Sequence, residues 1–175
     1  MMRIIGLAGW SGAGKTSLIK RLLPVLVEQG LTVSTVKHAH HRFDIDHPGK
    51  DSFAHREAGA KEVLIVSGER FALMHELRGA DEPELDHLLS LMSPVDLVIV
   101  EGFKKAPYPK IEIHRRETGK PYLYPDDSLI TAVACDAPEA VSDRIALPLD
   151  DTAAIAKQIL ADAAPIESVI KALRA

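Results

Sequence analysis

A glycine-rich motif near the N-terminus restricts more than any other feature what this chain can fold into. The stretch Gly9–Thr16 reads GWSGAGKT and fits G-x-x-x-x-G-K-[ST] at every fixed position. The apolar run Ile4–Ala8 precedes it, and apolar residues recur at helical spacing from Leu18 to Leu26. This order of strand, glycine-rich loop and helix predicts a phosphate-binding loop, whereas a chance glycine-rich turn would not need these flanks.

The chemistry of phosphate binding explains the residue types in this loop. Glycines let the backbone wrap closely around a phosphate chain, and the N-terminus of the following helix adds unpaired N–H groups and partial positive charge. Lys15 is expected to bridge the β- and γ-phosphates, and Thr16 is expected to give its hydroxyl to Mg²⁺. The predicted nucleotide-binding residues are Gly12, Ala13, Gly14, Lys15, Thr16 and Ser17.

Apolar runs alternate with helical patterns along the rest of the chain. This alternation predicts an α/β fold of the P-loop NTPase type, with a mostly parallel sheet flanked by helices. Val63–Val66 and Phe71–Met74 are predicted to form a hairpin, and a small β-containing insertion is expected from about Phe71 to Leu91. The alternating segment Lys110–His114 is expected to be an edge strand.

Length and composition exclude several classes of protein. The 175 residues suit a single domain covering 1–175, and a hydrophobic share of 46% provides a core. A net charge of −4 argues against nucleic-acid or membrane-surface binding. The chain has one cysteine, Cys135, and lacks an apolar run of about 18 residues, so we expect a cytoplasmic protein with neither a disulfide nor a transmembrane helix.

A second candidate site residue ends a continuous apolar run. Val95–Val100 is predicted to be a strand covered on both faces, and Glu101-Gly102 follow it directly. In P-loop proteins an acid at this position orders the Mg²⁺ shell. Glu101 is therefore predicted to bind the metal ion together with Thr16, and to be catalytic together with Lys15.

The segment Lys37–His47 is rich in histidine and aspartate and follows the predicted second strand. Our preferred interpretation is a nucleotide-facing loop in which Asp46 holds Mg²⁺ or orients a water, so that Asp46 is a third metal-binding and catalytic candidate. A zinc site and a merely solvated loop are the alternatives. Lys37 and Lys50 are candidates to face phosphate or an anionic partner.

Guanine is best recognised by a carboxylate that accepts from its N1–H and 2-amino groups. The usual Asn-Lys-x-Asp signature is absent from the sequence, but Asp136 follows the predicted buried strand Leu129–Ala134. Asp136 is the predicted guanine acceptor, with a turn aspartate before Pro138 as the alternative. Cys135 is interpreted as a small buried residue and not as a nucleophile.

With these residues identified, the chain resembles the molybdopterin-guanine dinucleotide biosynthesis protein B (MobB) family. The resemblance implies GTP and Mg²⁺ binding, weak GTPase activity and a homodimer. It also implies an adapter role toward the molybdopterin guanylyltransferase and other molybdenum-cofactor enzymes. The segments that carry it are Gly6–Leu18, Val36–His55, Glu57–Ala60, Val98–Lys104, Pro109–Ile113 and Ala134–Asp136.

Two functions from different classes follow. The first is a GTP-binding adapter whose hydrolysis is slow, because the sequence shows no arginine finger or catalytic glutamine set against the phosphate loop. Arg42, Arg56 and Arg115 of a second subunit or partner are the candidates to supply the missing cation. The second is a P-loop small-molecule kinase or ATP-dependent ligase. It would need an acceptor pocket, for which the candidates are Tyr108, Lys110, Tyr122, Tyr124 and Asp126.

Overall fold

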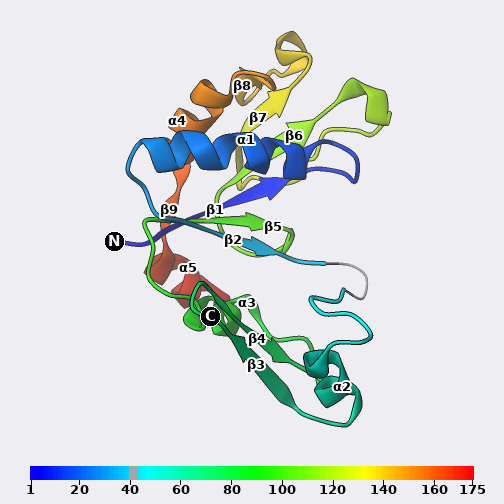
Figure 1. Ribbon diagram of the computed structural model, residues 1–175. Helices are drawn as coiled ribbons and strands as arrows, with labels where there is room; N and C mark the ends of the chain where they lie inside the picture. The colour runs from blue at the N-terminus through cyan, green and yellow to red at the C-terminus, as the bar shows by residue number, and fades with distance from the viewer. Residues whose placement is uncertain (40–42) are drawn as a thin grey trace. The chain divides into compact units, whose positions relative to one another are not determined.

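The computed structural model describes residues 1–39 and 43–175 (Figure 1). They form two compact units, one of Met1–His38 with Leu85–Ala175 and a smaller one of Ala39–Glu84. The insertion is therefore longer than the predicted Phe71–Leu91 and begins earlier in the chain. The His40-His41-Arg42 segment, including the candidate cation Arg42, lies outside the described residues, and a single domain over 1–175 stays a prediction.

The larger unit is built on a mostly parallel sheet, which confirms the predicted α/β class. Its strand order is β2-β5-β1-β6-β7-β8, and each neighbouring pair in this order is parallel. A short strand, β9, pairs with the start of β1 in the antiparallel sense. The strands are β1 Arg3–Ala8, β2 Val33–Lys37, β5 Leu97–Glu101, β6 Lys110–His114, β7 Ile130–Cys135, β8 Ile145–Pro148 and β9 Ala164–Pro165.

Helices cover both faces of this sheet because its strands are apolar on both sides. Alternate residues of β1 show this arrangement. Ile5 packs with α1 (Lys15–Glu28) and α4 (Thr152–Asp162), whereas Ile4 packs with α3 (Leu85–Ser90) and α5 (Ile166–Leu173). The helix α1 continues through Pro24 without a break. Two 3₁₀ turns, η1 Arg116–Thr118 and η2 Pro138–Ala140, complete the unit.

The strand Lys110–His114 is central, so the prediction of an edge strand is wrong. It lies between β1 and β7, and all of its residues are buried. Its three polar side chains each have a partner from a later segment of the chain. Lys110 Nζ donates to Asp127 at 3.1 Å, Glu112 accepts from the Leu123 and Tyr124 N–H groups, and the His114 ring bonds the Lys120 carbonyl.

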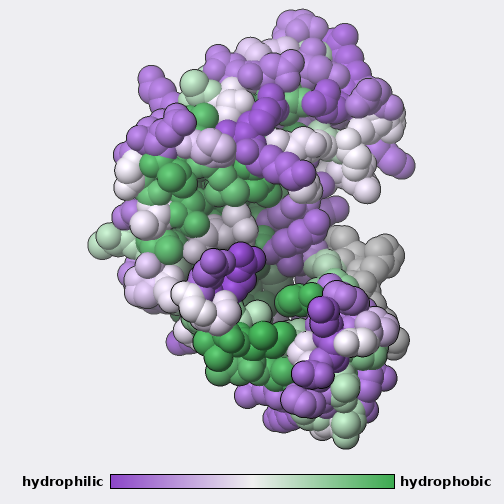
Figure 2. Space-filling view, viewed as in Figure 1, coloured by the Kyte–Doolittle hydropathy of each residue, from purple (hydrophilic) through white to green (hydrophobic). Residues whose placement is uncertain are grey.

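The smaller unit contains helix α2 (Asp51–Glu57) and the predicted hairpin, which is confirmed as β3 (Glu62–Val66) and β4 (Phe71–His75). One side of the hairpin buries Val63 and Met74. On the other side Leu64 lies opposite Leu73, and Val66 lies opposite Phe71. These four side chains, which we call the hairpin face, are 52–72% exposed. Figure 2 shows a hydrophobic area in the region of the hairpin.

Within residues 1–39 and 43–175, none of the helices is long and apolar enough to cross a membrane.

Candidate nucleotide-binding site

The phosphate loop joins β1 to α1, as the sequence predicts. β1 ends at Ala8 and α1 begins at Lys15, with Gly14 at its N-cap in the left-handed region (φ 96°). In the described part of the chain, the N–H groups of Gly12, Gly14, Lys15 and Thr16 donate to no protein acceptor. A helix start with several free donors is a binding site for an anion.

Lys15 is held across its own loop. Its Nζ donates to the Gly9 carbonyl at 2.9 Å and to the Trp10 carbonyl at 3.0 Å. Burial lowers the pKa of Lys15, and the nearby cations Lys104 and Lys37 lower it further, while Glu101 opposes them. The cluster of positive charge is unfavourable for the protein alone and favours a bound polyanion.

Thr16 and Glu101 come together although 85 residues separate them in the sequence. The Thr16 hydroxyl lies 3.5 Å and 3.4 Å from the two Glu101 carboxylate oxygens. β5 pairs with β1, which aligns Glu101 with Leu7 just before the phosphate loop. Adjacent oxygen ligands of octahedral Mg²⁺ are about 3 Å apart, so this pair fits the ion. Thr16 and Glu101 would hold Mg²⁺, which would neutralise phosphate charge when bound.

The turn after Glu101 is closely packed and requires glycine. Gly102 has φ 108°, and a Cβ atom there would overlap the side chain of His38. The His38 ring stacks on Phe103 with 4.6 Å between ring centroids, and the Tyr108 hydroxyl donates to the Gly102 and Phe103 carbonyls. These contacts fix the peptide beside the Glu101 carboxylate.

Trp10 anchors the outer side of the phosphate loop. Its indole Nε1 donates to the Pro121 carbonyl at 2.8 Å. The ammonium groups of Lys104 and Lys120 lie over the ring, 5.4 Å and 5.7 Å from its centroid. The loop is therefore tied to the segment after β6, and two more cations lie beside it.

Asp136 lies just after β7, at the same edge of the sheet as the phosphate loop and Glu101. Its exposed carboxylate accepts the Arg116 N–H at 3.1 and 3.2 Å. That contact fixes the turn after β6 and leaves lone pairs for a further donor. Cys135 is fully buried, and burial raises the pKa of its thiol, as expected for a packing residue.

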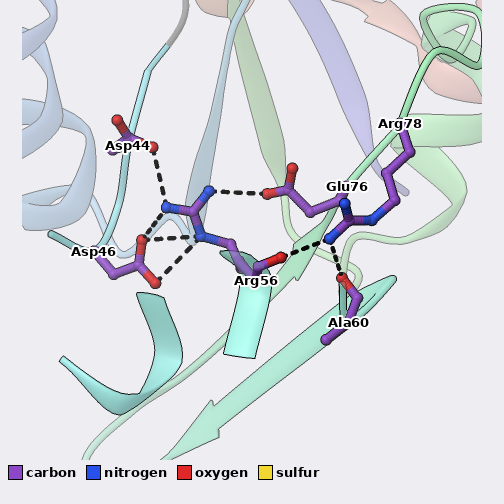
Figure 3. Close-up of polar contacts among 6 residues, drawn as sticks. All are labelled: Asp44, Asp46, Arg56, Ala60, Glu76 and Arg78. Carbon is purple, nitrogen blue, oxygen red and sulfur yellow. Dashed lines mark hydrogen bonds and ion pairs between the residues drawn. The ribbon is translucent and has the colours of Figure 1, made fainter. Parts of the chain in front are cut away.

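Asp46 has a different partner from the predicted metal ion. In the smaller unit its carboxylate accepts from Arg56 Nε at 3.0 Å and from Arg56 Nη2 at 2.5 Å (Figure 3). Arg56 also pairs with Asp44 and Glu76, and Arg78 donates to the Arg56 carbonyl. The Arg56 hydrogen bonds hold the pKa of Asp46 below its ordinary value. Asp46 is therefore already neutralised by a cation, and Arg56 has three carboxylate partners.

Two further observations limit the alternatives. Among residues 1–39 and 43–175, no group of three or more His, Cys, Asp or Glu side chains could hold a metal, so the described part of the Lys37–His47 loop forms no zinc site. Of the proposed acceptor-pocket residues, Tyr108 is 0% exposed and Lys110 is 2% exposed and paired with Asp127. Neither of them can line an open substrate pocket.

Arg115 lies at the phosphate loop of its own chain, whereas the sequence suggested it only as a cation supplied by a second subunit or partner. A Cβ atom built on Gly14 would lie 3.3 Å from Arg115 Nε and 3.7 Å from Nη2. The guanidinium therefore rests on the phosphate loop of the same chain. Arg115 directly follows β6, but the sequence could have placed it at the phosphate loop only if β6 had been predicted to lie next to β1.

Comparison with known proteins agrees with this geometry. Residues 4–136 match the family described as molybdopterin guanine dinucleotide synthesis protein B, MobB. The molybdopterin-guanine dinucleotide biosynthesis adapter protein of Escherichia coli is 42% identical over 79% of this chain and 81% of its own length. The protein of the same name from Haemophilus influenzae is 41% identical over 84% and 82%.

Solved structures extend the similarity to the fold. A crystal structure of molybdopterin-guanine biosynthesis protein B has a TM-score of 0.72 at 32% identity, covering 90% of this chain and 98% of that one. Bacillus subtilis MobB has a TM-score of 0.70 at 25% identity, covering 93% and 98%. The match over most of the chain, together with the phosphate loop and its Thr16–Glu101 pair, shows that this chain belongs to the MobB family.

Proposed function

We propose that this chain binds GTP with Mg²⁺ and serves as an adapter in the biosynthesis of molybdopterin guanine dinucleotide. The observation that carries the proposal is the Thr16–Glu101 pair at the start of α1, beside the Lys15 ammonium. Free N–H groups would bind the phosphates, Lys15 would leave its loop carbonyls for phosphate oxygens, and Thr16 and Glu101 would hold the ion. Asp136 would accept from the guanine edge.

The adapter role rests on the relatives. The proteins from E. coli and H. influenzae that are 42% and 41% identical to this chain over the aligned residues are named adapter proteins. We extend that role to this chain, with the molybdopterin guanylyltransferase and other molybdenum-cofactor enzymes as partners and the cytoplasm as location. Neither nucleic acid nor membrane is proposed as a partner.

Hydrolysis would be slow in this arrangement. Glu101 lies 3.4 Å from the Thr16 hydroxyl, where it would hold the metal ion and would not orient an attacking water. Arg56, one candidate for a cation supplied by a partner, is 11% exposed and paired with Asp44, Asp46 and Glu76. Transition-state charge would then lack a free arginine from this position.

The homodimer is proposed to form through the hairpin face. Its four apolar side chains lie on one side of two paired strands and remain 52–72% exposed. A contiguous apolar surface of this kind is typical of protein–protein contact. The β6 strand, where the sequence suggested an exposed edge, is buried and cannot serve.

Calorimetric titration tests the nucleotide proposal. We expect GTP to bind in the presence of Mg²⁺ more tightly than ATP, and Lys15→Ala to abolish the heat. During turnover we expect phosphate to pass only to water. Tight ATP binding with transfer to a metabolite would favour the kinase, and a well-folded protein that binds neither nucleotide would refute the proposal.

A further inference from the structure

The position of Arg115 follows from the strand order. β6 runs parallel to β1, with Ala8 aligned to Glu112, so the residue after β6 and the loop after β1 leave the sheet at the same edge. Arg115 is that residue. Its Nε and Nη2 lie within 4 Å of the point where a Gly14 Cβ atom would be, next to Lys15 in the chain.

The backbone of Arg115 is fixed by hydrogen bonds, while its guanidinium has no hydrogen-bond or ion-pair partner in the part of the chain that the structure describes. The Arg115 carbonyl accepts from the Thr118 N–H at 3.1 Å and from the Thr118 hydroxyl at 2.8 Å. The next N–H, that of Arg116, donates to Asp136. The Arg116 guanidinium pairs with Glu139 at 2.7 Å, whereas across residues 1–39 and 43–175 no carboxylate pairs with Arg115.

Electrostatics makes this an unfavourable place for an unpaired cation. The N-terminus of α1 carries partial positive charge, which repels a guanidinium. Lys15 adds a full positive charge one residue away from Gly14. The arrangement becomes favourable when an anion lies between these groups, and a planar guanidinium suits a phosphate because it can donate two parallel hydrogen bonds.

We propose that Arg115 binds the phosphate chain of the nucleotide in its own subunit. The inference rests on the proposed GTP site and adds a residue to it. The cation comes from the same chain and is in place before the nucleotide binds, so it stabilises bound di- and triphosphate alike. It is a binding residue of the ground state and not a finger that acts only on the transition state.

The test compares Arg115→Ala with Arg116→Ala, a matched control that removes an exposed neighbouring arginine and keeps the backbone N–H to Asp136. Affinities for GDP and for a non-hydrolysable GTP analogue are measured with Mg²⁺, and turnover is measured at saturating GTP. We expect Arg115→Ala to lower the affinity for both ligands by about 10- to 100-fold. Turnover at saturation should change by less than about threefold, and Arg116→Ala should match the wild type.

Arg115→Gln serves if Arg115→Ala does not fold, since it keeps the size and polarity of the side chain without the charge; the same loss of affinity is expected. Unchanged affinity for both ligands in a folded variant would overturn the inference. So would unchanged affinity with a large fall in turnover, because that result would describe a transition-state finger. If the wild type bound no purine nucleotide, the proposed GTP site itself would fail, and that outcome is distinct from the other two.

Discussion

The hydroxyl of Thr16, in the first turn of α1, lies 3.4 Å from a carboxylate oxygen of Glu101, the last residue of β5. Replacing Glu101 by Gln keeps the shape of the side chain and removes the charge that attracts Mg²⁺. We expect the Mg²⁺-dependent part of GTP affinity to fall by about 10- to 100-fold, while binding measured in EDTA stays unchanged. Asp46→Asn is the matched control, and an equal loss of Mg²⁺ dependence in that variant would return Asp46 to the metal site.

Gly102 controls where that carboxylate lies. Alanine at this position must adopt φ 108° and overlap His38. We expect Gly102→Ala to lower the free energy of unfolding by roughly 1–3 kcal/mol. We also expect it to weaken Mg²⁺-dependent binding, because a shift of this turn displaces the adjacent Glu101. Gly119→Ala is a suitable control, since its Cβ atom would have nothing within 4 Å although φ is also positive (63°). If Gly102→Ala lowered stability but left Mg²⁺-dependent binding unchanged, the turn would not be needed to position Glu101 for the metal ion.

The smaller unit should respond to acid through Asp46. Arg56 depresses the pKa of this carboxyl in the folded state below its ordinary value of 3.8. The stabilisation is therefore complete above that value and is lost as the pH falls through the folded pKa. The protection of residues 43–84 from hydrogen exchange should not change with pH near neutrality. It should fall below about pH 4, where Asp46 becomes protonated.

Substitution separates this carboxylate from its neighbours. Asp46→Asn should lower protection of the same residues already at pH 7 and flatten the acid response. Asp44→Asn should do so much less, because the Asp44 side chain is 63% exposed whereas that of Asp46 is 4% exposed. Equal effects of the two variants would contradict the central place of Asp46 in the network.

The hairpin face should govern self-association. Introducing lysine at both Leu64 and Val66 places two charges on the apolar side of the hairpin and should convert a homodimer to monomers in light scattering coupled to gel filtration. Glu69→Lys adds positive charge at the turn, away from that face, and should leave the assembly intact. A dimer that survives the double substitution would place its interface elsewhere.

Base selection should depend on Asp136. Asp136→Asn keeps an oxygen for the Arg116 N–H but replaces one acceptor by a donor. We expect the preference for GTP over ATP to shrink by about 10-fold or more, with folding unchanged. Glu139→Gln tests a nearby carboxylate with no proposed base contact. Undiminished selectivity in Asp136→Asn would remove this residue from base recognition.

The features that the sequence predicted correctly are local ones. The phosphate loop, the strand that ends at Glu101 and the hairpin each follow from residue order within a short segment. The placement of β6 could not be predicted, because Lys110, Glu112 and His114 have the alternation of an exposed edge. Their partners, such as Asp127 and the Leu123 and Tyr124 N–H groups, lie in a later loop whose position depends on the fold.

The same limit applies at the site. A carboxylate in a polar loop is equally compatible with a metal ion and with an arginine, and only the structure shows that Asp46 meets Arg56. Arg115 is also invisible to local patterns, because its contact with Gly14 depends on β6 lying beside β1. Long-range pairing therefore decides which candidate groups meet.

The ionisable side chains of β6 also restrict how the chain can assemble. If this strand were shifted by one residue in the sheet, Glu112 would turn to the opposite face, away from the two loop N–H groups that donate to its carboxylate. In such a shifted state the Glu112 carboxylate would be buried without hydrogen-bond donors, so the free energy of that state would be higher. The buried charges thus select one alignment among otherwise similar apolar pairings. In that alignment Arg115 lies beside Gly14, at the start of α1.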